Sequence, residues 1–406
     1  ILPHSIQLTF ELLEFFDEIY IACYLCDVNE IKELIKTYYS NKEDKANANT
    51  QKLKASEHLI INISLALCIS VFINKKLHRE TSDQATSLNS KLASTDNAST
   101  PVDPKTSLPV LNSLKLEELL ELQDQLFLQS IYYYGKVSVI SEGIVTVQGI
   151  LLLIIYLETT LVTSHMNWIL VSVAVRFAQI LGLHRFESFQ NFPEKDRAFR
   201  RRIWWFCQYF DMEICYRNGS TPMVDECDVS TLTSRDREYS EANEGCKDED
   251  CSMVVPPEVI KDITQNKQIH NFVGYFLMKL TRIRARSYKG LFSASVKTTF
   301  KSISSTLNSL NTEMNELRNS MDKRIRPRLY TDSDFQEYLE FPVLMNGLNI
   351  DCAKENVIAT QLTYFSHLMT INRLPFQIVT PDHDESCEES LIYRALYLDS
   401  ARTILH

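Results

Sequence analysis

The chain's one Cys-x-x-Cys pair, Cys23 and Cys26, has the spacing that zinc sites use. The pair lies in an apolar segment, and no second pair follows at ligand spacing. Core packing therefore explains these thiols better than a metal site does. The other cysteines are scattered, and Cys68, Cys207 and Cys215 lie inside apolar helical runs. We expect reduced thiols in an intracellular compartment and no disulfide framework.

The nine histidines form no catalytic pattern, since none has metal-ligand spacing or stands beside a serine or cysteine nucleophile signature. No glycine-rich phosphate loop occurs either. His184 and Arg185 could act as an acid–base pair, because histidine is the usual proton carrier near neutral pH. They follow Gly182, however, and a glycine followed by cationic side chains is typical of a helix end. We therefore predict that the chain is not an enzyme.

The arginine triplet at residues 200–202 could serve as a nuclear signal or a phosphate clamp. It lies within a predicted helix with aromatic faces, so we expect these guanidinium groups to bind internal acids or carbonyls. Asp211 stands between Phe210 and Met212, where an unpaired carboxylate would be costly. Arg176, in the preceding predicted helix, is the first candidate for its partner, and Arg201 is the second. The sequence thus predicts a structural ion pair of Arg176 with Asp211.

The composition favours a large all-α domain built from packed helical hairpins. The 406 residues are 45% hydrophobic and 23% charged, which is enough apolar material for one large core or two merged ones. Only 9 glycines and 12 prolines interrupt long runs without strand-like alternation, so helices are expected. The net charge of -10 repels phosphate, so this chain alone should not bind DNA strongly.

Apolar periodicity and changes in composition divide the chain into five parts. They are an N-terminal helical layer (1–80), a disordered linker (81–112), a middle core (113–233), an acidic exposed loop (234–257) and a C-terminal helical part (258–406). The predicted helices span residues 5–39, 52–78, 114–134, 168–183, 193–217, 267–292, 295–323, 335–348, 355–371 and 390–406. The apolar run 144–157 is shorter than the ~20 residues that a bilayer requires, so no membrane partner is expected.

The helix predicted at 193–217 should be nearly enclosed by protein. One face carries five apolar residues, and a second carries Trp205, Tyr209, Met212 and Tyr216. The remaining strip holds Arg197, Arg201, Gln208 and Asp211. These polar groups need partners if the helix is central.

A series of short motifs runs through the chain in a fixed order. The stronger ones are Thr146-Val147-Gln148, Leu151-Leu152-Leu153, Val173-Ala174-Val175-Arg176-Phe177-Ala178, Leu181-Gly182-Leu183-His184-Arg185, Arg200-Arg201-Arg202-Ile203-Trp204-Trp205, Tyr209-Phe210-Asp211, Gly219, Pro222 and Asp228-Val229. Weaker ones follow at Asn372-Arg373-Leu374-Pro375-Phe376 and Ala401-Arg402. Their order and spacing resemble the middle homology region of fungal binuclear zinc-cluster transcription factors. In two departures, Gly149 replaces the usual alanine, and Gly-Ser-Thr-Pro at 219–222 replaces a more basic sequence.

The resemblance implies the regulatory domain of a sequence-specific RNA polymerase II transcription factor that works in the nucleus. The six-cysteine zinc cluster of that family is absent from this chain, so zinc and DNA contacts are expected in an N-terminal module of the parent protein. The chain starts without methionine and ends within a helical pattern, as a fragment would. The expected partners are the transcription machinery or a masking protein, a small apolar ligand and a second copy in a homodimer.

Two hypotheses on function follow from the resemblance. In the first, a small apolar effector or a masking protein controls activation, because members of the family respond to metabolites, xenobiotics or such partners. Five aromatic residues on neighbouring predicted helices could line the effector pocket, although a packed core explains them equally well: Tyr156, Trp168, Phe177, Trp205 and Tyr209. In the second, the domain is a dimerisation or assembly scaffold of a DNA-bound complex without effector switching.

Overall fold

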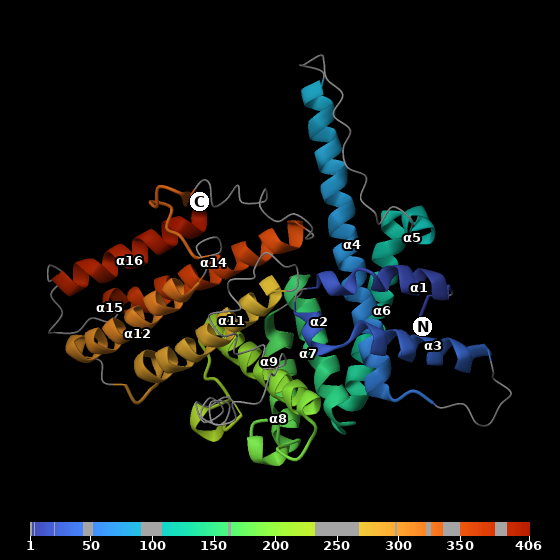
Figure 1. Ribbon diagram of the computed structural model, residues 1–406, viewed down its shortest axis with the longest axis horizontal. Helices are drawn as coiled ribbons and strands as arrows, with labels where there is room; N and C mark the ends of the chain where they lie inside the picture. Colours follow the sequence, from blue (N-terminus) through green and yellow to red (C-terminus); the bar gives the residue numbers. More distant parts are fainter. Residues whose placement is uncertain are drawn as a thin grey trace. The chain divides into compact units, whose positions relative to one another are not determined.

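The structure is a computed structural model of the 406-residue chain. It describes residues 2–3, 5–19, 21–43, 52–90, 108–160, 164–231, 268–296, 299–321, 326–335, 350–377 and 388–406. Within these ranges every regular element is a helix, which confirms the predicted all-α fold (Figure 1). The chain divides into two compact units, residues 1–182 and 183–406.

The first unit is a set of helical hairpins around the long helix α4 (Ala55–Ser90). α4 packs against α6 (Leu116–Val137) and α7 (Ile144–Thr159), and α7 packs against α8 (Ser164–Ile180) (Figure 1). The other helices of this unit are α1 (Ile6–Leu13), α2 (Ala22–Leu25), α3 (Val28–Glu43) and α5 (Pro109–Ser113).

The window Ala55–Leu77 of α4 is long and apolar enough to cross a membrane, with a mean hydropathy of 1.8. Of this window 78% is buried inside the protein, as in the core helix of a soluble protein. Gly149 of α7 lies directly against it, because a Cβ atom at Gly149 would come within 2.9 Å of Leu59 Cδ2. The glycine that replaces the usual alanine therefore permits close packing of α7 on α4.

The helix predicted at residues 5–39 is divided into shorter pieces, which corrects that expectation. α1 ends at Leu13, a short 3-10 turn η1 covers Phe16–Glu18, and α2 and α3 follow. Cys26 is extended, with φ −139° and ψ 139°, and the Asp27 carboxylate accepts the Asn29 N–H at 2.8 Å. Such a local side-chain bond satisfies backbone donors at a helix start, and the apolar spacing alone did not reveal it.

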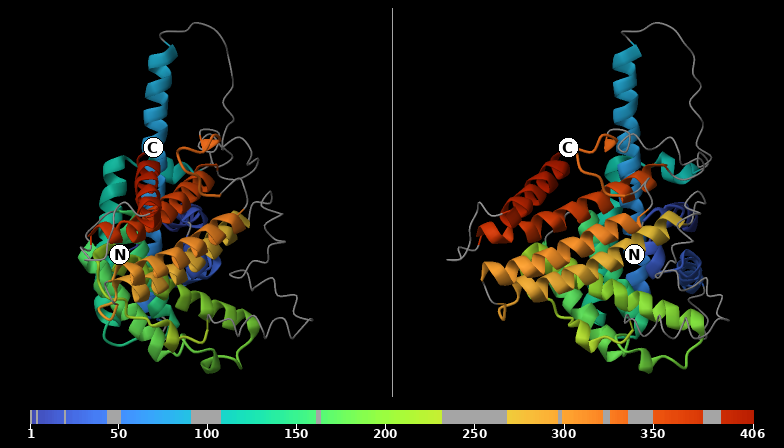
Figure 2. Two further views of the ribbon diagram at one scale, coloured as in Figure 1. Left: turned by 90° about the vertical axis from the view of Figure 1, so that its left-hand side faces the viewer. Right: turned by 60° about the vertical axis from the view of Figure 1, so that its left-hand side comes forward.

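The structure also moves the boundaries of the predicted linker at 81–112. α4 continues to Ser90, and Figure 2 shows its last turns extending beyond its neighbours in the unit. Residues 81–90 contain neither glycine nor proline. Because extending an existing helix costs little free energy, these residues can continue α4. α5 begins at Pro109, inside the predicted linker. Residues 91–107 and the predicted acidic loop at 234–257 lie outside the described residues. So do residues 336–348 of the helix predicted at 335–348.

The second unit is a layered set of long helices. α11 (Gln268–Ser287) packs against α9 (Glu194–Asn218), α12 (Phe300–Ser320) and α14 (Ile350–Asn372), and α14 packs against α16 (Glu388–Leu405) (Figure 2). Short elements complete the unit: η2 (Phe186–Ser188), η3 (Glu226–Asp228), the π turn η5 (Tyr288–Phe292) and α15 (Leu374–Gln377). The buried Arg284 of α11 pairs with Glu213 of α9, which fastens these two helices together.

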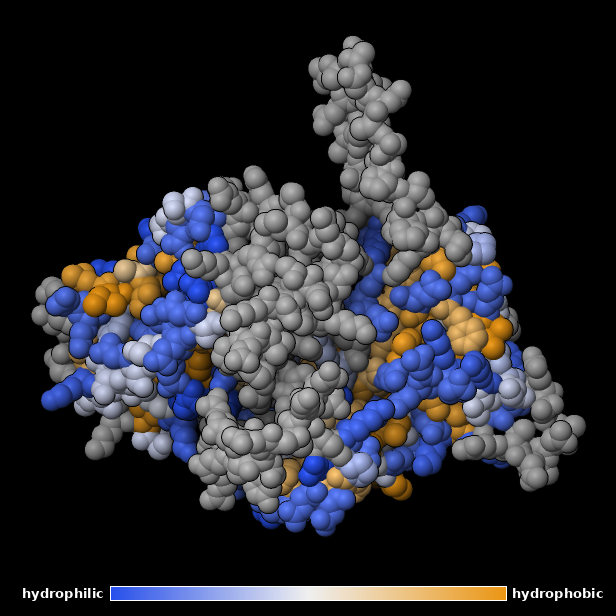
Figure 3. Space-filling view, viewed as in Figure 1, coloured by the Kyte–Doolittle hydropathy of each residue, from blue (hydrophilic) through white to orange (hydrophobic). Residues whose placement is uncertain are grey.

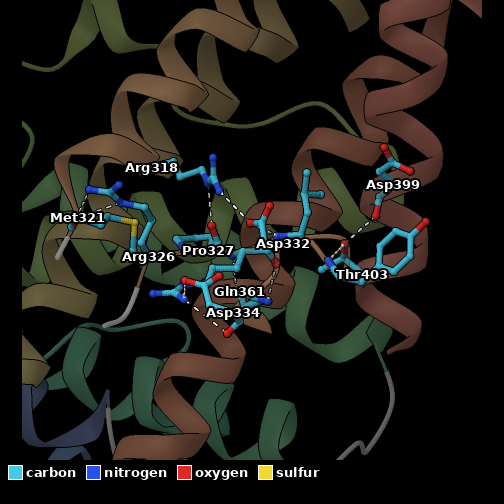
Figure 4. A network of polar contacts seen from close by, with 12 residues as sticks. Arg318, Met321, Arg326, Pro327, Asp332, Asp334, Gln361, Asp399 and Thr403 are labelled. Carbon is cyan, nitrogen blue, oxygen red and sulfur yellow. Dashed lines mark hydrogen bonds and ion pairs between the residues drawn. The ribbon is translucent and has the colours of Figure 1, made fainter. Parts of the chain in front are cut away.

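The segment 326–335 fastens α12 to α14 (Figure 4). Arg318 of α12 donates to the Pro327 carbonyl at 2.7 Å. The carboxamide of Gln361, on α14, bonds the backbone of Arg328 in both directions, at 3.0 Å to the N–H and 2.9 Å to the carbonyl. An irregular segment thereby has its backbone groups satisfied by side chains of the helices that it joins.

Candidate functional site

Helix α9 carries an enclosed cluster of aromatic and polar side chains. Pro193 precedes the helix, and Gly219, with φ 66°, ends it in the left-handed region that favours glycine. Residues 203–208 are all buried, as the sequence predicted for this helix. The helix therefore has fixed ends and a buried middle, which can hold the side chains of residues 205–209 rigidly.

Trp205 and Tyr209 lie one turn apart on α9 and are stacked. Their ring centroids are 5.7 Å apart with an interplanar angle of 25°. Trp205 also meets the ring of Phe206 edge-on at 4.5 Å and is 2% exposed, whereas Tyr209 is half-buried. This arrangement is an aromatic face that is rigid on one side and partly accessible on the other.

Two polar atoms within this cluster have no hydrogen-bond partner among the described residues. They are the indole Nε1 of Trp205 and the amide Oε1 of Gln208. Gln208 is 4% exposed, so water does not reach its side chain freely. A buried donor or acceptor left without a partner costs about 1–3 kcal/mol. One atom is a donor and the other an acceptor, so polar groups of a bound ligand could satisfy them.

A similar pair lies at the N-terminal side of this cluster. The Trp204 and His184 rings have centroids 5.5 Å apart, and Trp204 Nε1 and His184 Nδ1 also lack a hydrogen-bond partner among the described residues. Burial and the neighbouring Arg185 lower the pKa of His184, so its ring is neutral and can accept a hydrogen bond.

Asp211 fastens the loop after α9 to the helix. Its Oδ2 atom accepts the N–H groups of Met223 at 2.8 Å and Val224 at 3.0 Å. The Cys215 thiol lies 3.7 Å from its Oδ1 atom. The burial predicted for Asp211 is confirmed, since it is 2% exposed. Its carboxylate thus positions the loop, and this aspartate is a structural residue.

The predicted partner of Asp211 lies in the first unit. Arg176 is exposed on α8, and its guanidinium donates to Gln179 Oε1 at 2.9 Å. The ion pair of Arg176 with Asp211 remains a prediction.

Hydrogen bonds join the segment after α8 to the segment after η3. The carbonyl of His184 accepts the N–H of Ser230 at 3.0 Å and the hydroxyl of Thr231 at 3.2 Å. The Ser230 hydroxyl in turn accepts the N–H of Phe186 at 2.9 Å. The predicted helix end at Gly182 is confirmed by its φ of 71°. His184 is therefore held as a structural residue at this turn, as the sequence favoured.

Two arginines of the triplet on α9 face aromatic rings. The Arg200 guanidinium lies 4.2 Å from the Phe192 ring centroid, and that of Arg201 lies 5.9 Å from the Phe186 centroid. These cation–π contacts arise because aromatic side chains of the preceding segment fold back over the first turns of the helix. The internal acids and carbonyls expected for the triplet remain a prediction.

The remaining aromatic residues predicted for an effector pocket belong to the first unit. Tyr156 is buried, accepts a hydrogen bond from Gln123 at 3.1 Å and stacks on Phe127 at 5.0 Å. Trp168 is 50% exposed, and Phe177 is partly buried. Of the five predicted aromatic residues, the structure thus brings Trp205 and Tyr209 together. Gln208 is a further residue of this cluster, which the sequence indicated only as a polar group in need of a partner.

The described residues contain no group of three or more histidine, cysteine or acidic side chains that could hold a metal ion. Cys26 of the Cys-x-x-Cys pair is buried and receives a hydrogen bond from Gln148 at 3.6 Å. Burial raises the pKa of this thiol strongly, which disfavours the thiolate that binds metals.

The chain is similar in sequence to a known protein family and to several known proteins. The Fungal specific transcription factor domain matches residues 12–326. Transcription factor TAC1 of Candida albicans is 32% identical over 433 aligned positions, which cover 99% of this chain and 42% of that protein.

Two further relatives match shorter parts of the chain. Halotolerance protein 9 of Saccharomyces cerevisiae is 29% identical over 53% of the chain and 18% of its own length. The ABC-transporter-regulating transcription factor of Aspergillus oryzae is 23% identical over 40% of the chain and 17% of its own length. The chain therefore spans less than half the length of these relatives. No solved structure matches it significantly.

Proposed function

The chain belongs to the fungal-specific transcription factor domain family, and from this premise we propose that a small aromatic effector controls it by binding at Trp205, Gln208 and Tyr209. The family consists of transcription factors and not enzymes, so the chain is a regulatory domain of a protein that acts in the nucleus. In this proposal the effector changes how the DNA-bound parent protein is exposed to the transcription machinery or to a masking protein. Zinc and DNA contacts belong to another part of the parent protein.

The observation that carries this proposal is the donor and acceptor pair on α9. Trp205 Nε1 and Gln208 Oε1 are buried without a hydrogen-bond partner among the described residues, beside the half-buried ring of Tyr209. Ligand sites are mostly apolar, with a few polar groups that fix the orientation of the ligand. An aromatic molecule with one hydroxyl group fits this chemistry, because its ring stacks on Tyr209 and its hydroxyl bonds both atoms. The similarity to an ABC-transporter-regulating transcription factor supports control by a small molecule.

A matched pair of probes tests the proposal. We expect 2-naphthol to raise the melting temperature of the chain and to change its tryptophan fluorescence, whereas naphthalene, which lacks the hydroxyl, has a much smaller effect. Trp205→Phe and Gln208→Leu should each abolish the difference between the two probes, since each removes one hydrogen-bonding atom. Trp168→Phe is the matched control and should keep it. Equal responses of wild type and Gln208→Leu to 2-naphthol would contradict the site.

The stability of the unliganded chain gives a second readout. Replacing an unsatisfied buried amide by an apolar side chain of similar size is neutral or stabilising. Gln208→Leu should therefore unfold at an equal or higher temperature than wild type while the full-length parent loses its effector response. A large loss of stability would mean that Gln208 is already satisfied and has a purely structural role.

A further inference from the structure

Helix α16 presents its polar side to the core of the second unit. Its buried residues are Ser390, Tyr393, Ser400 and Thr403. The Tyr393 hydroxyl donates to Asn308 Oδ1 at 2.8 Å, and the Thr403 hydroxyl accepts the N–H of Tyr330 at 3.2 Å. These bonds, one near each end, fix the rotation of α16 about its axis.

The opposite side of α16 is apolar and exposed. Leu391 is 53% exposed, Leu398 38% and Leu405 86%, and Ile392 beside them is 51% exposed. Figure 3 shows hydrophobic residues gathered on the surface where α16 lies in Figure 1. A surface helix normally points its apolar stripe inward. The inner hydrogen bonds of α16 hold its polar side inward and its apolar stripe outward. The core of the unit therefore does not cover the stripe.

The exposed stripe has the spacing of a coiled-coil seam. Leu391, Leu398 and Leu405 recur every seven residues, with Ala395 and Arg402 between them at the alternate heptad position. All five residues lie outside the core of the unit. Leucine at position d is favoured in parallel two-stranded coiled coils, and a polar residue at position a selects the register and the number of strands.

We propose that α16 of a second copy of this chain covers this stripe, in a parallel two-stranded arrangement. Charge complementarity favours this occupant. With the leucines at position d, Arg394 takes position g and Asp399 position e of the next heptad. Facing g and e positions of parallel helices form salt bridges between strands. Each copy would therefore place Arg394 beside Asp399 of the other copy.

Both charges already have contacts within their own chain. Arg394 is exposed and lies over the Phe376 ring, 5.2 Å from its centroid. The Asp399 side chain is 33% exposed and bonds Arg402 within its own helix at 3.4 Å. An exposed ion pair within one helix contributes little to the stability of the fold. Replacing it by an ion pair between two copies therefore costs little free energy. Since the stripe is only three leucines long, we expect weak self-association.

Sedimentation equilibrium of the purified chain over a range of concentrations tests the seam. The average mass should rise from monomer toward dimer with increasing concentration. Leu398→Glu should raise the dissociation constant at least about tenfold, because each copy then places a charge in an apolar seam. Leu362→Glu is the matched control, since Leu362 on α14 is 41% exposed and lies off the stripe. It should leave the dissociation constant unchanged.

Charge exchange tests the partner and its orientation. Arg394→Asp and Asp399→Arg should each weaken self-association, and the double variant should restore it. Leu398→Cys should form a disulfide-linked dimer under mild oxidation, beyond the background of the wild-type cysteines, because position d faces its own copy in a parallel pair. A wild-type chain that stays monomeric at every concentration would overturn the proposal. Equal effects of Leu398→Glu and Leu362→Glu would overturn it as well.

Discussion

Gln361 forms both hydrogen bonds of its carboxamide with the backbone of a single residue, Arg328. The Arg328 N–H donates to Oε1 at 3.0 Å, and Nε2 donates to the Arg328 carbonyl at 2.9 Å (Figure 4). Gln361 is buried, so this pair replaces water for a segment that has no regular structure. These two hydrogen bonds join residues 33 positions apart and hold the segment 326–335 against α14.

The first prediction follows from this pair. Gln361→Leu should lower the free energy of unfolding by about 2–4 kcal/mol, because it leaves a partly buried N–H and a carbonyl without partners. Gln125→Leu, at an exposed position on α6, should change it by less than about 0.5 kcal/mol. Urea denaturation of both variants measures the difference, and equal values would show that the loop backbone finds water instead.

The second prediction concerns Asp211. Asp211→Ala should destabilise the fold by about 3–5 kcal/mol, since it leaves two backbone N–H groups without their acceptor and any cation paired with Asp211 without its counter-charge. Asp211→Asn should cost less, because its amide oxygen can still accept both N–H groups that now donate to Oδ2. Combining each with Arg176→Ala in a double-mutant cycle measures the predicted ion pair directly. A coupling energy near zero would leave the loop as the reason for this aspartate.

The third prediction compares two helical glycines. Gly149→Ala should destabilise the chain by about 1–3 kcal/mol, because the new Cβ atom would lie 2.9 Å from Leu59 Cδ2. Gly135→Ala should stabilise it by about 0.5–1 kcal/mol, since a Cβ atom there meets nothing within 4 Å and alanine favours the helix. Thermal unfolding of the two variants gives shifts of opposite sign if α7 packs on α4 as described.

The fourth prediction is a dependence of stability on pH. Burial and the nearby Arg284 guanidinium hold the pKa of His367 well below its ordinary value. Ser287 and the Tyr216 ring are its other polar and aromatic neighbours, at 3.3 Å and 5.2 Å. The unfolded chain titrates near its usual pKa of about 6.5, so it binds more protons than the folded chain below that pH. Stability should be fully present above about pH 6.5 and should fall as the pH decreases toward the lower, folded pKa.

The variant His367→Gln separates this contribution from the others. Glutamine can keep the hydrogen bond to Ser287 but does not titrate, so the loss of stability between about pH 6.5 and pH 5 should be smaller than in wild type. Part of the dependence should remain, because burial also lowers the pKa of His58 and of His184. Urea denaturation across this range checks the result, and identical slopes would place the proton uptake elsewhere.

The sequence by itself determined the helical fold class and the ends of its central helix. Apolar residues recur along α9 at helical spacing on two faces, and glycine at 219 has the conformational freedom that a helix end uses, so Pro193 and Gly219 could be recognised as its limits. The same pattern predicted the burial of Asp211 and a need for partners at Gln208. These features are local, because the periodicity of a helix reports which of its own faces is covered.

Only the tertiary structure decided which groups meet. The amides of Met223 and Val224 bind Asp211, and the backbone of Arg328 binds Gln361, yet a backbone group has no side-chain signature in a sequence. The interruption near Cys26 and the extension of α4 to Ser90 depend in the same way on packing and capping across the fold. In α16 the inner hydrogen bonds of Tyr393 and Thr403 turn a leucine stripe outward, against the expectation from its pattern. Through-space partners fix these outcomes, because the free energy of a buried polar group depends on the atoms around it and not on its neighbours in sequence.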